Sequence, residues 1–598
     1  MFCKKSVRKD GREYLSIVEG FRDENNVTRQ KTIRSIGYVD EFTHLYDDPF
    51  AHFQQVAKEI EKEQKDIEQV SFNRYERLPV GTHDKKNIGS AAISAIYHQF
   101  ELDYFINNRR RYEKKEFNHN TIFKLLIYDR ILFPSSKRGA WAHKDLFFEK
   151  MDFSLDDIYH ALEFFVRHKD AMLYAIHKKM CSLYKRNTTL VYYDVTNYYF
   201  EVNDEKDYKH RGVSKEHQPH PIIQMGLFMD MQGIPITYKL FDGNTHDSIT
   251  FSHSLSEIKK KYEIRDTIFV GDKGLMSGNN LRKIRLNHNG YIISYSLRKG
   301  DQNTVSWALS DEGFIFNEDK SYGHKSRIAE REIRVSNLAG GYEQVPVWER
   351  QIVVYSEKYA KKAKADRKRA IEKAFDLTQN PGKYNQANNY GALKYVKQTI
   401  VNSDGKKSTD QVKYSFDAAK LKNEERFDGY YMITTNVIGT NTVKEMKDPD
   451  TGKVKPHLSN FYVINRPIYD DEIMRIYRGL WKIEETFKVT KTAALNTRPI
   501  YLSKKEHIES HFLMCFVSLV ILRVLQLRLD WEYSATTIAK SLAQATGNYF
   551  TDGYYVFAFQ DKVLEALEKD LGIPLAHKYI RKGDARTILG KSKNILPQ

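Results

Sequence analysis

The chain contains very little cysteine. Only three cysteines occur among 598 residues, Cys3, Cys181 and Cys515, and no two of them are close in sequence. Disulfide-stapled folds need several cysteines, and cysteine-based zinc sites need closely spaced pairs. The sequence therefore excludes both, and it fits a reducing, cytoplasmic compartment.

Long hydrophobic runs are equally scarce. The N-terminus, MFCKKSVRKDGREY, lacks the apolar stretch of a signal peptide. The most apolar run, residues 512–527, is short for a membrane span and contains Arg523. We expect this run to be a buried core helix, and we expect no contact with a membrane. The chain also lacks a GxxxxGK[ST] motif, which argues against an ATP-driven motor.

Positive charge, by contrast, is abundant. The formal net charge is +17 and the isoelectric point is near 9.2. Neutralising phosphates releases counterions, so nucleic acid is the expected partner, although a basic protein without such a partner has the same composition. The length is too great for one core and indicates three or four domains.

The N-terminal regions differ in their pattern. Residues 10–38 hold two strand-like runs around the turn-forming RDENN, and residues 1–38 contain nine Lys/Arg against five Asp/Glu. Residues 1–45 are therefore predicted to form a small basic β-hairpin region, which either contacts DNA or is simply solvated. Helical spacing over 46–186 predicts a helical N-terminal DNA-binding domain.

After residue 186 the pattern changes to that of an α/β domain. Residues 187–299 read as three strands, a helix, a strand, a helix and a fifth strand, which is the order of a ribonuclease H-like core with a mixed five-stranded sheet and flanking helices. This order stops at 300–427, a predicted β-rich insertion with a basic helix at 358–373. It resumes at 428–530, and a C-terminal helical region follows at 531–598.

Two aspartates stand where such a core places its chemistry. Asp194 lies within the strand VYYDVTNYY, and Asp272 ends the strand DTIFVGD. The first and fourth strands are neighbours in this fold, so both carboxylates should meet at the carboxyl ends of the strands. With a third carboxylate they would form an oxygen-rich site for Mg²⁺ or Mn²⁺, and two such ions can assist phosphoryl transfer. The alternative is that each is an ordinary cap or salt-bridge partner.

The third carboxylate is expected in YRGLWKIEETFKVTK. Tyr477, Glu484 and Lys491 recur at seven-residue intervals, so one continuous helix would present them on one face. We favour Glu484 over its neighbour Glu485. The competing structural role for Glu484 is an ion pair with Lys488, four residues on, which is worth about 0.3–0.5 kcal/mol.

At these residues the chain resembles a known family. DVTNYYFE, QMGLFMD, FDGNTHD, FVGDKG and YRGLWKIEETFKVTK together resemble insertion-sequence DDE transposases with a β-rich insertion between the second aspartate and the glutamate. That family has a Tyr-Arg-Glu-Lys signature helix. Tyr477, Glu484 and Lys491 match it in register, but Leu480 stands at the arginine position.

The resemblance implies that Asp194, Asp272 and Glu484 hold two divalent ions and that Tyr477 and Lys491 bind phosphates of the transposon end. Arg478 and Lys488 are further candidate DNA contacts, although Arg478 faces elsewhere and need not replace the missing arginine. The expected activity is cleavage at transposon ends and strand transfer to target DNA. Expected partners are double-stranded DNA, as terminal inverted repeats and target, and a second copy of the chain.

Two other functions fit the sequence. One is a structure-selective nuclease on the same core, which would cut DNA without transferring strands. The other is a non-catalytic DNA-binding protein derived from a transposase. The basic helix at 358–373 is either a DNA-backbone contact or a solvated face, and Trp307 and Trp348 are more simply core residues than stacking platforms for an unpaired base.

Overall fold

The structure is a computed structural model. It describes the chain apart from residues 23–26, 66–69, 78, 81, 83, 202–203, 213–219, 263, 265, 275–276, 338, 381–390, 402–410, 448–455, 493, 499 and 596–598. The chain divides into two compact units, Met1–His83 with Tyr549–Tyr555, and Asp84–Asn548 with Val556–Gln598. The six finer boundaries expected from the sequence stay a prediction.

The N-terminal unit is a three-stranded antiparallel sheet with one long helix. Strands β1 (Phe2–Val7), β2 (Glu13–Arg22) and β3 (Thr28–Tyr38) pair in the order β1-β2-β3, and α1 (Pro49–Lys65) packs against β1 and β2. The hairpin predicted from the sequence is β2 and β3. Strand β1 was missed because FCKKSV alternates too few apolar residues to be distinguished from a polar terminus.

A helical region opens the second unit, as the sequence predicted for residues after Asp84. Its helices are α2 (Ser90–Gln99), α3 (Leu102–Arg110), α4 (His119–Leu132), α5 (Lys137–Ala142), α6 (Leu155–Arg167) and α7 (Lys169–Tyr184). Side-chain caps stabilise the N-termini of two of these helices. At α4 the Asn118 side chain accepts hydrogen bonds from the backbone N–H groups of Asn120 and Thr121, and at α6 Ser154 forms a capping box with Asp157.

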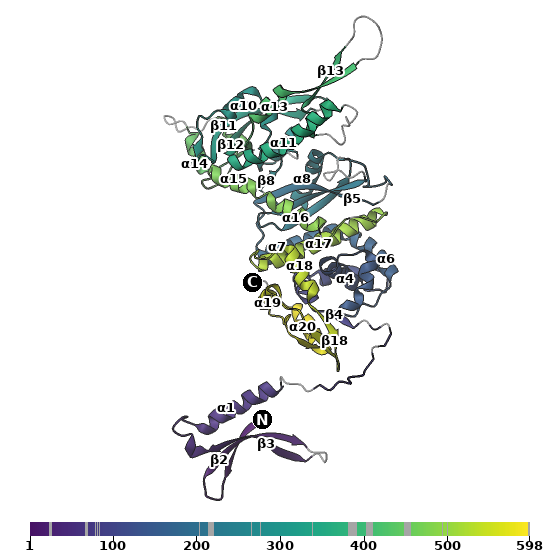
Figure 1. The fold of residues 1–598 in the computed structure, drawn as a ribbon, viewed down its shortest axis with the longest axis vertical. Helices are drawn as coiled ribbons and strands as arrows, with labels where there is room; N and C mark the ends of the chain where they lie inside the picture. Colours follow the sequence, from purple (N-terminus) through teal and green to yellow (C-terminus); the bar gives the residue numbers. More distant parts are fainter. Residues whose placement is uncertain are drawn as a thin grey trace. The chain divides into compact units, whose positions relative to one another are not determined.

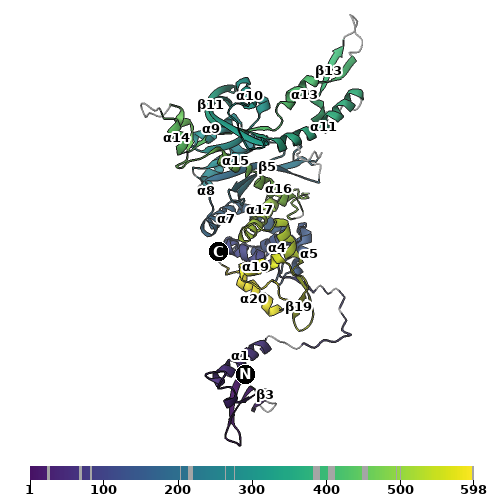
Figure 2. The same cartoon turned by 60° about the vertical axis from the view of Figure 1, so that its left-hand side comes forward.

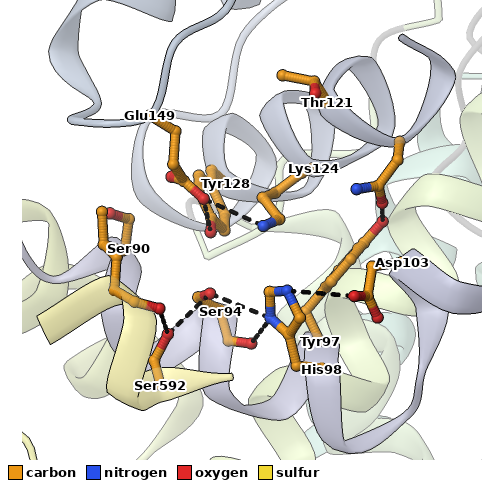
Figure 3. A network of polar contacts seen from close by, with 12 residues as sticks. Ser90, Ser94, Tyr97, His98, Asp103, Thr121, Lys124, Tyr128, Glu149 and Ser592 are labelled. Carbon is orange, nitrogen blue, oxygen red and sulfur yellow. Dashed lines mark hydrogen bonds and ion pairs between the residues drawn. The ribbon is translucent and has the colours of Figure 1, made fainter. Parts of the chain in front are cut away.

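A buried polar network fixes these helices to the C-terminus of the chain (Figure 3). Lys124 Nζ lies 3.1 Å from Glu149 Oε1, and His98 Nδ1 lies 2.8 Å from the carbonyl oxygen of Ser94. Burial, with the Lys124 charge, holds the pKa of His98 below its ordinary value. The Ser592 hydroxyl donates to Ser94 Oγ at 3.0 Å, so the last helix, α20 (Lys582–Ser592), is tied to α2. Most of these groups are hydrogen-bonded to one another, which is a structural role, although Glu149 Oε2 is buried without a hydrogen-bond partner among the described residues.

The central sheet has the predicted ribonuclease H-like core. The five strands are β5 (Leu190–Tyr199), β6 (Ile222–Asp230), β7 (Pro235–Asp242), β8 (Ile268–Gly271) and β9 (Gly290–Tyr295), in the order β7-β6-β5-β8-β9. Pairing is antiparallel for β5-β6 and β6-β7 and parallel for β5-β8 and β8-β9. Helices α8 (Asp247–Tyr262) and α9 (Gly278–Leu286) pack on one face of this sheet.

The insertion enlarges the same sheet instead of forming a separate one. Strand β15 (Tyr430–Thr435) pairs with β9, and the long hairpin β11 (Tyr322–Ser336) and β12 (Tyr342–Ser356) pairs with β15, so the sheet has nine strands with β10 (Ile315–Phe316) at its edge. The insertion also contains α10 (Gln302–Leu309), α11 (Glu357–Gln379), β13 (Val396–Val401), β14 (Gln411–Phe416) and α13 (Ala418–Glu425). A β-rich insertion was predicted; its fusion with the core sheet was not.

The second face of the sheet is covered by helices that follow the insertion. After α14 (Thr440–Glu445) and the short parallel pair β16 (Val437–Ile438) and β17 (Tyr462–Val463) come α15 (Asp470–Arg478), α16 (Trp481–Lys491) and α17 (Lys505–Arg528). Helices α16 and α17 lie between the sheet and the helical region (Figures 1 and 2). In α17, 94% of the most apolar window is buried. The helix is long and apolar enough to cross a membrane, but its burial inside the protein confirms the predicted core helix.

The C-terminal region is mixed, although only helices were predicted there. It contains α18 (Ala535–Gln544), β18 (Thr546–Tyr549), β19 (Tyr554–Phe557), α19 (Lys562–Leu571), β20 (Tyr579–Arg581) and α20. These strands join β4 (Lys85–Asn87) in a sheet of order β20-β19-β18-β4. Strands of three or four residues carry too little alternation to be recognised from sequence.

Candidate functional site

Asp194 and Ser294 lie on β5 and β9, and Asp272 follows directly after β8, the strand between them. Tyr192 pairs with Val270, and Val270 pairs with Ile292. Two residues further along each parallel strand, the same register brings Asp194 opposite Asp272, and Asp272 opposite Ser294. Residues paired in this way point to the same face, and adjacent strands are about 4.8 Å apart. This extension of the register beyond the paired residues supports the predicted neighbourhood of the two aspartates, which stays a prediction.

Asp272 is held in place by the neighbouring strand. Its Oδ1 accepts hydrogen bonds from the Ser294 hydroxyl at 2.6 Å and from the backbone N–H of Lys273 at 2.7 Å. The Asp194 Oδ1 accepts the backbone N–H of Val195 at 2.7 Å. Asp272 lies just past the end of β8 and is exposed, so its second oxygen faces solvent and can meet a ligand.

Helices α15 and α16 run along the face of β5 that carries Asp194. The Tyr192 hydroxyl donates to the carbonyl oxygen of Ile476 at 3.0 Å, and the Tyr198 hydroxyl lies 2.7 Å from Thr490 Oγ1. Because side chains alternate along a strand, Asp194 shares the face of Tyr192 and Tyr198. In sequence, Glu484 lies between these two contact points, on the exposed side of α16.

The helix that carries the signature is broken, which corrects a prediction. A single helix was expected to place Tyr477, Glu484 and Lys491 on one face, but α15 ends at Arg478 and α16 begins at Trp481. The backbone N–H groups of Leu480, Lys482 and Ile483 donate to the carbonyl three residues back instead of four. A 3-10 step rotates the chain by about 20° more per residue than an α-helical step. Three such steps therefore rotate Glu484 by about 60° around the helix axis relative to Tyr477.

The physical reason for the break is the packing of Gly479 on the sheet. A Cβ at residue 479 would lie 2.0 Å from the hydroxyl oxygen of Tyr192, so only glycine allows this approach. The Tyr192 hydroxyl then donates to the carbonyl oxygen of Ile476 at 3.0 Å, a carbonyl near the end of α15. Sequence spacing cannot show this contact, since Tyr192 and Gly479 are far apart in the chain.

The two adjacent glutamates have different surroundings. Glu485 lies 3.3 Å from the guanidinium of Arg523 on α17. Glu484 is exposed, and its carboxylate makes no side-chain hydrogen bond or ion pair with any described residue. In particular, the ion pair with Lys488 that was the structural alternative is not formed among the described residues. The surroundings therefore favour Glu484 as the carboxylate left for a ligand.

Tyr477 and Arg478 belong to a large cavity beside Asp272. Burial raises the pKa of Tyr477 to about 12; a hydrogen bond with Ser294 opposes this rise, and the Asp272 charge adds to it. The Arg478 guanidinium donates to the Tyr322 hydroxyl and lies 5.3 Å from the Tyr322 ring centre, so it faces the insertion. Arg478 thus does not replace the signature arginine missing at Leu480.

The cavity itself has a volume of about 880 Å³. Its walls combine tyrosines with cations, and Asp272 is the only carboxylate among the described residues that line it. The cations are Lys273, Arg298, Lys358 and Arg478, and the tyrosines are Tyr295, Tyr322, Tyr359, Tyr430, Tyr431 and Tyr477. Sequence reasoning missed this cavity and Ser294, because the lining residues come from six separate segments.

The remaining basic candidates lie on exposed surfaces. Lys488 is exposed on α16, and the Lys491 ammonium lies 5.5 Å from the Tyr198 ring centre. The predicted basic helix is α11, which exposes Lys358, Lys361, Lys362, Lys364, Lys368, Arg369 and Lys373. Trp307 packs beneath Lys325 and Arg327, and Trp348 stacks on His457 at 4.1 Å, so both tryptophans have structural contacts.

The carboxylates of Asp194, Asp272 and Glu484 suit a divalent ion chemically, but they do not form a closed metal site in this structure. No three or more His, Cys, Asp or Glu side chains within the described ranges converge closely enough to hold a metal ion. Two carboxylates come from adjacent parallel strands or their ends, and a third, uncommitted one lies on α16, which packs on β5. Hard carboxylate oxygens are the ligands that Mg²⁺ and Mn²⁺ prefer. The residues fit such an ion if Glu484 moves toward the aspartates.

Comparisons with known proteins decide the family. A model of the transposase DDE domain matches residues 199–521, more than half of the chain, and a model of the IS1634 family transposase N-terminal domain matches residues 3–70. The chain belongs to the DDE transposase family. The DDE match includes Asp272 and Glu484 and begins just after Asp194, and proteins with this domain generally use divalent metal ions.

Other comparisons add less to this family assignment. Among solved structures, the Mos1 transposase paired-end complex with left transposon end is similar at 13% identity, with a TM-score of 0.10. The match covers 37% of this DDE family member and 60% of that chain. None of the curated proteins matches it.

Proposed function

We propose that the chain is a DNA transposase that cuts phosphodiester bonds at the ends of its own element and joins the freed ends to target DNA. The proposal is supported by the position of Asp194 on β5 and of Asp272 directly after the adjacent parallel strand β8, and by the uncommitted carboxylate of Glu484 on α16, in a member of the DDE family. Two aspartates on the core strands β5 and β8, or directly after them, and a glutamate on the helix that packs on β5 suit phosphoryl transfer better than any other site among the described residues.

Asp194, Asp272 and Glu484 would hold the divalent ions, expected to be two Mg²⁺ or Mn²⁺. When bound, such ions supply activation of the attacking oxygen and stabilisation of the leaving oxygen. The chain's own residues prepare this arrangement. The Ser294 hydroxyl orients the Asp272 carboxylate, and the buried phenol of Tyr477, protonated at neutral pH, is a hydrogen-bond donor beside it.

The reaction consists of two displacements at phosphorus. In cleavage, a water oxygen forms a new bond to phosphorus while the bond to the 3′-oxygen breaks, and the 3′-oxygen takes up a proton. In strand transfer, that 3′-hydroxyl loses its proton, attacks a phosphate of the target and displaces another 3′-oxygen. No bond between protein and DNA is needed at either step.

DNA is expected to lie across the basic surfaces next to the carboxylates. Lys491 and Lys488 on α16 are placed to contact phosphates, and the tyrosine- and cation-lined cavity beside Asp272 suits a DNA strand. The partners are the terminal inverted repeats and target DNA. Because two ends are cut together, we expect at least two copies of the chain in the complex with DNA. We also expect the protein to act in the bacterial cytosol.

The test is Mg²⁺-dependent cleavage of duplexes that carry the element's own ends, by the wild-type chain and three variants. Glu484→Gln removes the proposed ligand charge, Glu485→Gln removes the competing carboxylate, and Glu506→Gln changes an exposed carboxylate at the start of α17. Only Glu484→Gln should abolish both cleavage and joining while retaining DNA binding.

Other results point to the other functions. Loss of cleavage in Glu485→Gln with activity retained in Glu484→Gln would move the ligand to the neighbouring residue. Cleavage by the wild type without any joining to a supercoiled target would indicate a structure-selective nuclease. Binding without cleavage at any Mg²⁺ or Mn²⁺ concentration would indicate a non-catalytic DNA-binding protein.

A further inference from the structure

The break between α15 and α16 arises from competition for one carbonyl group. In a continuous helix the carbonyl oxygen of Ile476 would accept the backbone N–H of Leu480, four residues on. Here that oxygen accepts the N–H of Gly479 at 3.0 Å and the hydroxyl of Tyr192 at 3.0 Å. A carbonyl oxygen has two lone pairs, so both are taken. The Leu480 N–H donates instead to the carbonyl oxygen of Tyr477 at 3.1 Å.

The plain alternative is that the Tyr192 hydroxyl simply finds a partner, as buried tyrosines usually do. The last carbonyls of a helix are common acceptors, because they lack an intrahelical donor. However, Gly479 and Leu480 both keep right-handed helical backbone angles, and α16 resumes at Trp481. The local backbone therefore gives no reason for α15 to end. A 3-10 stretch within a longer helix often marks a functional hinge.

Helix α15 is held by the insertion. It packs on β8 and β9, and two side chains of β11 bind it at both ends. The Ser326 hydroxyl donates to Asp470 Oδ2 at 2.7 Å at the first residue of the helix, and the Arg478 guanidinium at its last residue donates to the Tyr322 hydroxyl. The insertion therefore fixes the rotation of α15 about its axis.

Helix α16 is held by a different part of the chain. It packs on β5 and α17. The Arg523 guanidinium of α17 donates to Thr486 Oγ1 at 2.7 Å, and the Tyr198 hydroxyl of β5 lies 2.7 Å from Thr490 Oγ1. Because each helix has its own anchors, the rotation of one relative to the other is set at the two residues between them.

This rotation decides where the Glu484 carboxylate lies. The 3-10 steps rotate Glu484 by about 60° relative to a continuous helix. The side chains of a helix reach roughly 5–6 Å from its axis, so a rotation of about 60° moves a carboxylate by about the same distance. Bonds from Mg²⁺ to oxygen are only about 2.0–2.1 Å long. A ligand displaced by several ångströms cannot reach the same ion.

We propose that Tyr192 is a positioning residue of the metal site. Its hydroxyl keeps the helix broken at Gly479, and the break rotates Glu484 to the angle from which its carboxylate can close on an ion held by the two aspartates. Tyr192 precedes Asp194 by two residues on β5 and shares its face of the sheet. One strand thus supplies the first carboxylate and orients the helix that supplies the third. The inference rests on the proposed function, in which these carboxylates are the ligands.

The test compares variants of the full chain in three measurements: Mn²⁺ binding, Mg²⁺-dependent cleavage of the element's ends, and thermal denaturation. Electron paramagnetic resonance of the free ion measures Mn²⁺ binding without DNA, so this readout does not depend on activity. Tyr192→Phe keeps the ring and removes the hydroxyl. Tyr193→Phe is the matched control, because Tyr193 is also buried and its hydroxyl donates to Thr250 Oγ1 at 3.0 Å on the opposite face.

Tyr192→Phe should weaken Mn²⁺ binding and raise the Mg²⁺ concentration for half-maximal cleavage, each by roughly 10- to 100-fold, the usual cost of losing a group that orients a ligand. Gly479→Ala/Tyr192→Phe should lose at least as much, because alanine favours the continuous helix. Tyr193→Phe should lose as much thermal stability as Tyr192→Phe and keep the wild-type response to both ions. A tyrosine with a purely structural role would give no such difference.

Wild-type Mn²⁺ binding and Mg²⁺ dependence in Tyr192→Phe would overturn the inference, and so would equal changes in Tyr193→Phe. In either case, loss of cleavage in Glu484→Gln would still support the proposed function. If Glu484→Gln binds Mn²⁺ and cleaves the ends as the wild type does, Glu484 is not a ligand. The inference and the proposed metal site would then fall together.

Discussion

The carboxylate of Glu485 lies 3.3 Å from the guanidinium of Arg523, and Arg523 is 1% exposed. The same guanidinium donates to Gln526 Oε1 at 2.8 Å and to Thr486 Oγ1 at 2.7 Å. A buried cation needs such partners, because burying a charge without them is costly. Glu485 therefore joins α16 to α17, and this structural task leaves Glu484 as the free carboxylate of the pair.

The first prediction separates the two glutamates by stability. Glu485→Ala should lower the free energy of unfolding by about 2 kcal/mol, because Arg523 stays buried without its carboxylate. Glu484→Ala should change it by less than about 0.5 kcal/mol, as expected for an exposed site. Thermal denaturation of the two variants measures both values. The double variant Glu485→Ala/Arg523→Met should recover most of the loss, and equal stability of both single variants would contradict the assignment.

The second prediction concerns the orientation of Asp272. Ser294→Ala removes the hydroxyl that donates to Asp272 Oδ1, and the loss of such a supporting bond typically costs 10- to 100-fold in metal affinity or activity. Cleavage should therefore need a higher Mg²⁺ concentration for half-maximal rate. Ser296→Ala, in the same cavity, is the matched control and should not alter this requirement. An unchanged Mg²⁺ dependence in Ser294→Ala would remove Ser294 from the site.

The sequence predicted the order of the five core strands, but it did not predict that the strands of the insertion extend the same sheet. Runs of aromatic and β-branched residues identified β5 to β9, and their order placed β5, which carries Asp194, beside β8, which Asp272 follows. The pairing of β15 with β9 was not predictable, because edge strands carry no sequence mark of the partner they join. Ser294 could have been noticed as one of two serines in the otherwise apolar and aromatic run GYIISYSL, but its role depends on its contact with Asp272.

Gly479 shows most clearly why the site was only partly predictable. Its backbone is right-handed helical, so local sequence indicates an unbroken helix from Asp470 onward. The break arises from the Tyr192 hydroxyl, on a strand nearly three hundred residues earlier in the chain. Heptad spacing placed Glu484 at the border of the buried stripe and Glu485 further round, whereas Glu484 is exposed and Glu485 is half-buried beside Arg523. The choice of Glu484 as the third ligand stays a prediction.

The third prediction follows from this contact. Gly479→Ala should destabilise the fold by about 1–3 kcal/mol, since the new Cβ would lie 2.0 Å from the Tyr192 hydroxyl oxygen, even though alanine favours helices. Tyr192→Phe removes that oxygen, so Gly479→Ala/Tyr192→Phe should lose less than the sum of the single changes. Gly590→Ala, in α20 with open space around it, is the control and should be neutral or stabilising. Additive losses would show that the Tyr192 hydroxyl is not the obstacle.

The last prediction concerns acid stability. Burial, opposed by the nearby Glu113 charge, lowers the pKa of His119 from its ordinary value of 6.5 to about 4. Its ring lies 4.3 Å from that of Phe164, and its Nδ1 has no hydrogen-bond partner among the described residues. Between pH 6.5 and pH 4 the unfolded chain binds a proton that the folded chain excludes. Stability from this group is therefore complete above pH 6.5 and falls as the pH drops toward 4, by about 3 kcal/mol in total.

His119→Phe retains the ring packing and cannot be protonated, so the variant should lose less stability between pH 7 and pH 5 than the wild type. Thermal denaturation at both pH values measures the difference. His577→Phe, at an exposed position, is the control and should follow the wild type. Other buried histidines, such as His511, contribute equally to all three proteins, so the comparison isolates His119. Identical pH dependence in His119→Phe and the wild type would mean that His119 is protonated in the folded chain without cost.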